Sequence, residues 1–323
     1  MEYCVAIRTL GTAGDKYQTL LDSLNRQTIR PKKILVYIPD GYAIPKETIG
    51  WEEYIRSLKG MITQRSLPFD EVDTDYILFC DDDLWLADDF VERLYKGLKE
   101  HKGDCISPDI YKIHNYSFLG KIKKAIAGYA FPRRNDGWAF KIMRNGGYSY
   151  NYKPSADVLL SESAAGACML IKKSAYQAIH FDDERWLENY GFALGEDLLF
   201  FYKLFTYNYR LLIHSSVGIN HLDAGTGSKN LPKDWIRKNV ALALITSYRI
   251  GYDVKKTVSV FDKILWFVSN TVRHTEQYLF TFVRSLLKER RLVFFDYING
   301  IVDAYHYVHS EEYRNVPKYD AYL

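Results

Sequence analysis

The sequence has no apolar run long enough to cross a lipid bilayer, which takes about 18 uninterrupted apolar residues or more. It also carries little net charge, formally +3, and no block of Lys and Arg interleaved with aromatic residues indicates a nucleic-acid groove. We therefore expect neither a membrane-spanning protein nor a nucleic-acid-binding protein. No signal peptide is expected, because residues 3–7 already have the pattern of a strand.

Cysteine is scarce as well. The four cysteines, Cys4, Cys80, Cys105 and Cys168, lie within or at the ends of apolar runs, and none belongs to a CxxC pair or a zinc-type Cys/His pattern. This placement is typical of small buried side chains in a reducing compartment, so we expect a cytoplasmic protein without disulfides. Tyrosine is abundant, with 27 residues; aromatic surfaces often bind sugar rings, but tyrosine also packs in ordinary cores.

Short apolar strands alternate with helical patterns in the first third of the chain. Strand patterns cover residues 3–10, 32–38, 75–80 and 104–113, and helical patterns cover residues 15–27, 66–72 and 87–101. A second block predicts a strand and a helix over 166–179, a helix over 195–208 and a strand pair over 209–221. Such alternation predicts right-handed βαβ units and an α/β fold, in which helices flank a mostly parallel sheet.

Three segments break this pattern. Residues 118–134 are basic and amphipathic, residues 145–160 have the pattern of turns and short edge strands, and residues 224–232 are rich in glycine. After them the chain is helical to its end, and residues 229–323 contain 15 Lys and Arg against 10 Asp and Glu. We therefore predict two parts: a catalytic domain over residues 1–225 and a helical region over residues 226–323.

Three adjacent carboxylates, Asp81, Asp82 and Asp83, follow the apolar strand that ends at Cys80. Carboxylates this close raise one another's pKa unless a cation or several hydrogen-bond donors hold them ionised. A solvated acidic loop or a helix cap would explain them without any function. However, ligands of parallel α/β sheets bind at the carboxyl ends of the strands. Asp81 and Asp83 can converge there on one Mg²⁺ or Mn²⁺ ion, because both ions prefer oxygen ligands.

Several motifs, taken in order, resemble those of the inverting GT-A glycosyltransferases of the family 2 type, over residues 3–225. They are SLNRQTIRPKKILVY, YILFCDDD, GACMLIKKSAY followed by FDDE, GEDLLFFYKL and INHLDAG. The resemblance implies a GT-A (Rossmann-like) fold with a mixed, mostly parallel sheet and a helical C-terminal extension. It implies transfer of a sugar from a nucleotide-sugar to a hydroxyl of a glycan or lipid-linked acceptor, with Mn²⁺ or Mg²⁺ as cofactor.

The resemblance also assigns roles. Asp81, Asp83 and His221 would hold the metal, although His221 could equally be a structural histidine. In the ED motif, Asp197 would be the general base and Glu196 an acceptor contact, although both residues also suit a helix N-terminus electrostatically. The nucleotide-sugar would contact a further set of residues: Thr9, Asp40, Arg65, Asp81 and Asp82. Trp186, Tyr190 and Gly166 would lie near the acceptor or sugar, and the two aromatic residues could equally be core residues.

Around Asp40 the sequence is Pro-Asp-Gly-Tyr, where the family commonly has Asp-Asp-Gly-Ser, so this chain departs from the family pattern at the position that would face the nucleobase. Arg65 could equally be a surface arginine.

The helical region has two interpretations. Its helices could simply cap the catalytic domain, or their apolar faces and flanking Lys and Arg could touch anionic lipid. We favour packing with some peripheral contact at the inner face of the cytoplasmic membrane.

Two other functions compete with glycosyl transfer. A nucleotidyltransferase would share the α/β sheet and the acidic site, but the early segment RTLGTAGDK resembles a phosphate-binding loop only faintly. A non-catalytic glycan-binding protein would have lost the acidic motifs that this chain retains.

Overall fold

We describe the chain from a computed structural model, which covers residues 1–110, 137–142, 148–151, 154–190, 195–222, 234–254, 257–287 and 291–318. Its main sheet has strands β1 (Tyr3–Arg8), β2 (Lys33–Pro39), β3 (Glu53–Ser57), β4 (Tyr76–Asp81), β6 (Cys105–Pro108), β9 (Val158–Leu160), β10 (Cys168–Lys172) and β11 (Leu211–His214). They lie in the order β3-β2-β1-β4-β10-β6-β11-β9. Only the β10 and β9 pairings are antiparallel, so the sheet is mixed and mostly parallel, as the sequence predicts.

Two small antiparallel pairs accompany the main sheet. One joins β5 (Leu84–Leu86) to β12 (Ile219–His221), and the other joins β7 (Phe140–Ile142) to β8 (Tyr148–Tyr150). The predicted strand pair over 209–221 is therefore present as β11 and β12, but its two strands belong to different sheets.

Apolar side chains on both faces of the main sheet explain its central position. In β1, Tyr3, Val5 and Ile7 pack on one face, while Cys4 and Ala6 pack on the other. Helices α1 (Asp15–Asn25) and α3 (Phe90–Glu100) cover the first face with leucines at helical spacing. On the second face lie α2 (Met61–Arg65), α5 (Lys173–Ala178), the 3₁₀ segment η1 (Phe181–Tyr190) and α6 (Glu196–Thr206).

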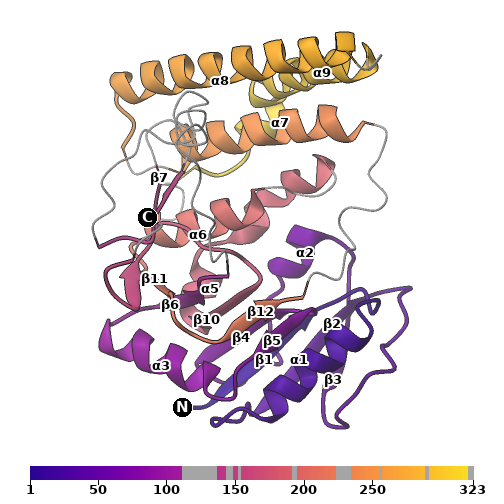
Figure 1. The fold of residues 1–323 in the computed structure, drawn as a ribbon, viewed down its shortest axis with the longest axis vertical. Coiled ribbons are helices and arrows are strands. Elements are labelled where there is room, and N and C mark those ends of the chain that lie inside the picture. The colour runs from indigo at the N-terminus through magenta and orange to yellow at the C-terminus, as the bar shows by residue number, and fades with distance from the viewer. Residues whose placement is uncertain are drawn as a thin grey trace.

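The C-terminal helices stack beyond α6, at the top of Figure 1. They are α7 (Trp235–Tyr248), the π-helical η2 (Arg249–Asp253), α8 (Val260–Leu287), α9 (Arg291–Val308) and α10 (Glu311–Arg314). Helix α9 packs against both α7 and α8. In the described ranges, none of the helices combines the length and the apolar character that crossing a membrane requires.

The structure confirms most of the predicted elements and corrects one. The helical turn predicted over residues 66–72 lies earlier, as α2, because Pro68 and the left-handed Phe69 do not continue a helix. The four cysteines are buried and free, as predicted. The basic segment 118–134, the glycine-rich segment 224–232 and the boundary predicted at residues 225 and 226 lie outside the described residues.

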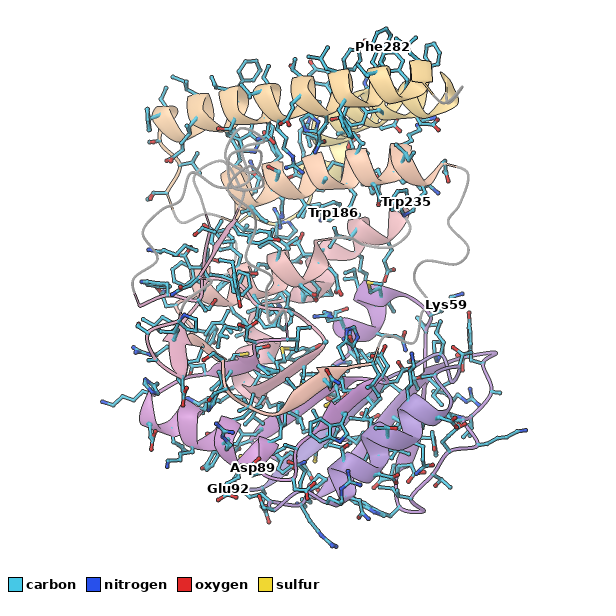
Figure 2. The ribbon with its side chains drawn as sticks, in the orientation of Figure 1. Lys59, Asp89, Glu92, Trp186, Trp235 and Phe282 are labelled. Carbon is cyan, nitrogen blue, oxygen red and sulfur yellow. The ribbon has the colours of Figure 1, made fainter. Side chains whose placement is uncertain are left out.

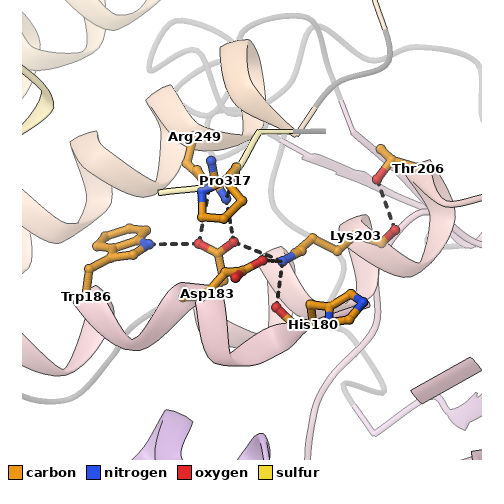
Figure 3. Close-up of polar contacts among 8 residues, drawn as sticks. His180, Asp183, Trp186, Lys203, Thr206, Arg249 and Pro317 are labelled. Carbon is orange, nitrogen blue, oxygen red and sulfur yellow. Dashed lines mark hydrogen bonds and ion pairs between the residues drawn. The ribbon is translucent and has the colours of Figure 1, made fainter. Parts of the chain in front are cut away.

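A carboxylate that is completely buried joins the C-terminal helices to the rest of the protein (Figure 3). Glu184 of η1 forms an ion pair with Arg249 of η2, at 2.7 Å between Oε1 and Nη2, and lies 3.2 Å from Lys203 Nζ of α6. The Trp186 indole N–H donates to Glu184 Oε2 at 2.8 Å, and Arg249 also donates to the carbonyl of Pro317 at 2.6 Å. Three helical elements and the C-terminal tail therefore meet at one charge.

Burial alone would raise the pKa of Glu184, but Arg249, Lys203 and the hydrogen bonds from Arg249 and Trp186 outweigh it and lower the pKa to about 2. A carboxyl whose pKa is depressed on folding stabilises the protein above its unfolded pKa, near 4.5 here, and that contribution is lost as the pH falls toward 2.

We predict that Glu184→Gln lowers the free energy of unfolding by about 3–5 kcal/mol at pH 7, because it removes the carboxylate paired with the buried Arg249 and leaves buried Lys203 with Asp183 alone. The difference from wild type should shrink below pH 4.5. Urea unfolding measures both effects. The control is Arg237→Gln, which removes an exposed ion pair with Asp303 and should cost roughly 1 kcal/mol or less. Equal losses in the two variants would contradict this account of Glu184.

Candidate functional site

The carboxyl ends of β1 and β4 lie side by side and open into a cleft of about 510 Å³. In this register Arg8 is paired with Asp81, so a cation and a carboxylate end adjacent strands. The cleft brings together nine of the predicted site residues: Thr9, Arg65, Asp81, Asp82, Asp83, Gly166, Glu196, Asp197 and His221. It also includes Arg8, Leu10, Thr12, Lys59, Gly60, Met61 and Gln64, which the sequence did not single out.

Strand pairing explains how residues distant in sequence reach this cleft. Because β10 runs antiparallel beside β4, the loop before it returns to the acidic end, where the Asp81 N–H donates to the Ala167 carbonyl at 2.8 Å. His221 reaches the cleft through the small β5–β12 sheet. Strand β12 pairs with β5, and the Leu222 N–H donates to the Asp83 carbonyl at 2.8 Å. Gly166 and His221 are thereby placed on the two sides of the acidic triplet.

Each aspartate of the triplet has a different partner, which resolves the problem of three adjacent charges. Asp81 lies 3.5 Å from an Arg8 guanidinium nitrogen, and Asp82 accepts a hydrogen bond from the Thr9 hydroxyl. Asp83 Oδ1 lies 3.0 Å from His221 Nε2. Burial raises the pKa of Asp81 to about 6 despite the nearby arginines, and it also raises the pKa of Asp82.

The ED pair begins α6 directly after Gly195, whose left-handed backbone (φ 88°) suits glycine. Arg65, at the end of α2, reaches both carboxylates: Nε lies 2.7 Å from Glu196 Oε2, and Nη2 lies 3.0 Å from Asp197 Oδ1. Arg65 is only 3% exposed, so the alternative of a surface arginine is wrong. Burial raises the pKa of Glu196 to about 8, although Arg65 opposes the shift.

Helix α2 is held from the opposite side by Glu188 of η1. Its carboxylate accepts a hydrogen bond from the Thr63 N–H at 2.7 Å and another from the Thr63 hydroxyl at 3.1 Å. A carboxylate at a helix N-terminus satisfies amides that have no partner within the helix. The five-residue helix that carries Arg65 is therefore anchored to the same segment that contains Glu184.

Three predicted contacts do not line the cleft. Asp40 is exposed, and its backbone N–H donates to the Ser57 carbonyl at 2.9 Å. Trp186 is 5% exposed and packs between η1 and the C-terminal helices (Figure 2), which corresponds to the core alternative. Tyr190 is half-buried with its ring 5.7 Å from that of Tyr307.

Of the residues that the sequence did not single out, Arg8 and Lys59 add two basic side chains to the cleft. Arg8 ends an apolar strand in the position equivalent to Asp81, but this equivalence is visible only once the two strands are paired. Lys59 follows β3, whose half-exposed residues gave no clear apolar pattern.

The residues of the cleft fit a divalent ion whose ligands come partly from the substrate better than an ion held by protein side chains alone. Among the described residues, no three His, Cys, Asp or Glu side chains are grouped closely enough to hold an ion alone, so Asp81 is not gathered with Asp83 and His221. Asp83 and His221 do present an oxygen and a nitrogen side by side. Mg²⁺ commonly binds one or two carboxylates and takes its other ligands from substrate phosphates and water.

Part of the chain matches a glycosyltransferase family model, and its fold is similar to that of solved structures. Residues 53–177, which include the acidic triplet but not the ED pair, match the family described as Glycosyl transferase family 2. Two crystal structures of S. aureus TarS 1-349 have a similar fold: a complex with UDP-GlcNAc has a TM-score of 0.51, and a second structure of the same fragment has a TM-score of 0.52. Each is 14% identical over 94% of this chain and 80% of that chain. No curated protein matches the sequence.

The two TarS structures confirm the fold class predicted from the sequence.

Proposed function

Given a GT-A fold and a match to glycosyltransferase family 2, we propose that this chain is a metal-dependent, inverting glycosyltransferase. It would move a sugar from a nucleotide-sugar to a hydroxyl of a glycan or lipid-linked acceptor. One observation carries the proposal: a single cleft contains both the acidic triplet with His221 and the Glu196–Asp197 pair. Nucleotide-sugar binding is supported by the TarS complex with UDP-GlcNAc.

The charge of the cleft supports metal dependence. Its lining includes five carboxylates against three basic side chains, Arg8, Lys59 and Arg65, so its formal charge is negative even before a diphosphate enters. Asp83 and His221 would hold a divalent ion there, with Asp81 facing it. When bound, Mn²⁺ or Mg²⁺ would supply positive charge that stabilises the departing nucleoside diphosphate. The Thr9 and Asp82 pair, which lies beside these residues, would contact the ribose hydroxyls.

The acceptor side of the reaction needs a base. In an inverting transfer the acceptor hydroxyl attacks the anomeric carbon from the face opposite the leaving group, and it loses its proton as the new bond forms. Asp197 is suitable, because its side chain is 36% exposed to the cleft while Glu196 is almost buried. Glu196 would instead position the acceptor.

We predict that Asp197→Asn lowers single-turnover transfer on the order of 10²-fold or more, with donor affinity little changed. Asparagine keeps the size of the side chain but cannot accept the proton. Single-turnover transfer with saturating donor and acceptor measures the effect.

The matched variant is Glu196→Gln, which should affect acceptor use more than the chemical step. If Glu196→Gln is inactive while Asp197→Asn transfers at the wild-type rate, the base is Glu196.

We predict that Asp83→Ala weakens Mn²⁺ binding roughly 10–100-fold or more, because it removes a direct oxygen ligand. Isothermal calorimetry with MnCl₂, with and without a nucleotide-sugar, measures this affinity, and Asp81→Asn tests the second carboxylate. The control is Asp89→Ala, which removes an exposed carboxylate outside the cleft. Unchanged Mn²⁺ affinity in Asp83→Ala and Asp81→Asn would rule out the proposed ion site.

Peripheral contact with an anionic membrane is a further part of the proposal. Helix α8 carries a row of exposed apolar side chains along its length, and Phe282 points outward at the top of Figure 2. These exposed residues are Val260, Phe261, Ile264, Phe267, Val268, Val272, Leu279, Phe280, Phe282, Val283 and Leu286. A helix with such a face can lie in the interfacial region of a bilayer, and nearby Lys and Arg would favour anionic lipid.

We predict co-sedimentation with phosphatidylserine-containing vesicles that weakens as salt rises, since the electrostatic part of the attraction is screened. The triple variant Ile264→Gln, Val268→Gln, Phe280→Gln should bind less. Leu58→Gln, which changes an exposed leucine outside α8, should bind as wild type does. Absence of wild-type binding at low salt would leave α8 and its neighbours as a packing cap only.

A further inference from the structure

Arg65 joins the two carboxylates of the ED pair through different nitrogens of one guanidinium. Its position is fixed on several sides. The guanidinium carbon lies 5.7 Å from the centre of the Phe200 ring, and the backbone carbonyl of Arg65 accepts a hydrogen bond from the Tyr176 hydroxyl. Glu188 anchors the N-terminus of the same helix. The arginine is therefore a rigid support for α6 rather than a mobile surface side chain.

The pairing leaves the two ends of the Asp197 carboxylate in different environments. Oδ1 is buried against Arg65, whereas the side chain as a whole is 36% exposed and lines the cleft. The exposed part must therefore be the portion that Arg65 does not contact. One oxygen is held, and the other is presented to the space where an acceptor would bind.

Gly166 shows how closely this arrangement is packed. A Cβ atom at this position would lie 1.8 Å from Asp197 Oδ1 and 2.7 Å from Arg65 Nη2. Any side chain there would displace one member of the pair. The close approach of the loop before β10 thus requires glycine, and it confines Asp197 to the orientation in which Oδ1 meets Arg65.

We propose that Arg65 is the positioning residue of the base: it holds Asp197 by Oδ1, keeps the other oxygen toward the acceptor and balances the charge of the ED pair. This inference rests on the proposed function, in which Asp197 accepts the proton of the acceptor hydroxyl. The charged and titratable groups that face the pair from neighbouring elements are Arg8 of β1, Asp81 of β4 and Tyr176 of α5.

Removing Arg65 should change both geometry and charge. A misplacement of about 1 Å in a catalytic group can cost on the order of 10²-fold in rate, so Arg65→Met should lower kcat by about that factor. Because Arg65 is proposed to place the base, its loss should fall on kcat, while the KM for the donor changes little. Arg65→Lys should not restore kcat, because one ammonium cannot replace a fork that reaches two carboxylates.

Lys59→Met is the matched control, because it removes another cation of the cleft lining whose ammonium donates to the Tyr42 hydroxyl at 2.6 Å. It should raise the KM for the donor more than it lowers kcat. The inference is overturned if Arg65→Met keeps the wild-type kcat, or if Arg65→Lys recovers full kcat.

A double-mutant cycle tests the same inference without turnover, so its failure is distinguishable from failure of the proposed function. Urea unfolding of Arg65→Met, Asp197→Asn and the double variant should show coupling, with the effect of Arg65→Met on the unfolding equilibrium about fivefold or more smaller in the Asp197→Asn background. Additive effects would mean that Arg65 does not hold Asp197 in solution, and they would overturn the inference even in an active enzyme.

Discussion

The buried charge of Glu184 connects the parts of this protein that its proposed chemistry needs. Arg249 brings the C-terminal helices to it, Lys203 brings α6, and Glu184 itself belongs to η1. A carboxylate without access to water is costly unless cations and hydrogen-bond donors surround it, so these elements cannot separate without exposing an unpaired charge. The C-terminal helices are thus attached to the rest of the protein by an interaction that is specific in geometry.

The same segment reaches the candidate site by a second route. Glu188 holds α2 through Thr63, and α2 ends in Arg65, while Lys203 lies two turns beyond Glu196 and Asp197 on α6. Helix α2, which carries Arg65, and helix α6, which carries Glu196 and Asp197, are therefore both anchored to η1. Each of the five carboxylates in the cleft has a partner on another segment: Arg8, Thr9, His221 or Arg65. A preorganised site of this kind needs little rearrangement when a reaction creates charge.

Sequence patterns predicted the sheet and most of its helices, because apolar periodicity in strands and helices reflects burial directly. They also predicted the acidic triplet and the ED pair, since runs of carboxylates at element ends are visible without a structure. Arg8 was missed because a strand-end arginine is unremarkable until its neighbour in the sheet is known. Trp186 was assigned to the acceptor or the core, and only its tertiary contacts with Tyr307 and Tyr313 place it. The helix predicted over residues 66–72 was displaced, because a five-residue helix has too few positions to show a period.

The anomeric configuration of the released sugar tests glycosyl transfer at this cleft most directly. The protein would be incubated with Mn²⁺ and a panel of nucleotide-sugars that includes UDP-GlcNAc, with water as the acceptor, and the first sugar released would be followed by proton NMR. The proposed mechanism predicts release from at least one donor, dependent on Mn²⁺, with inverted configuration at the anomeric carbon. Retained configuration would contradict it, as would an absence of release from every donor in the panel.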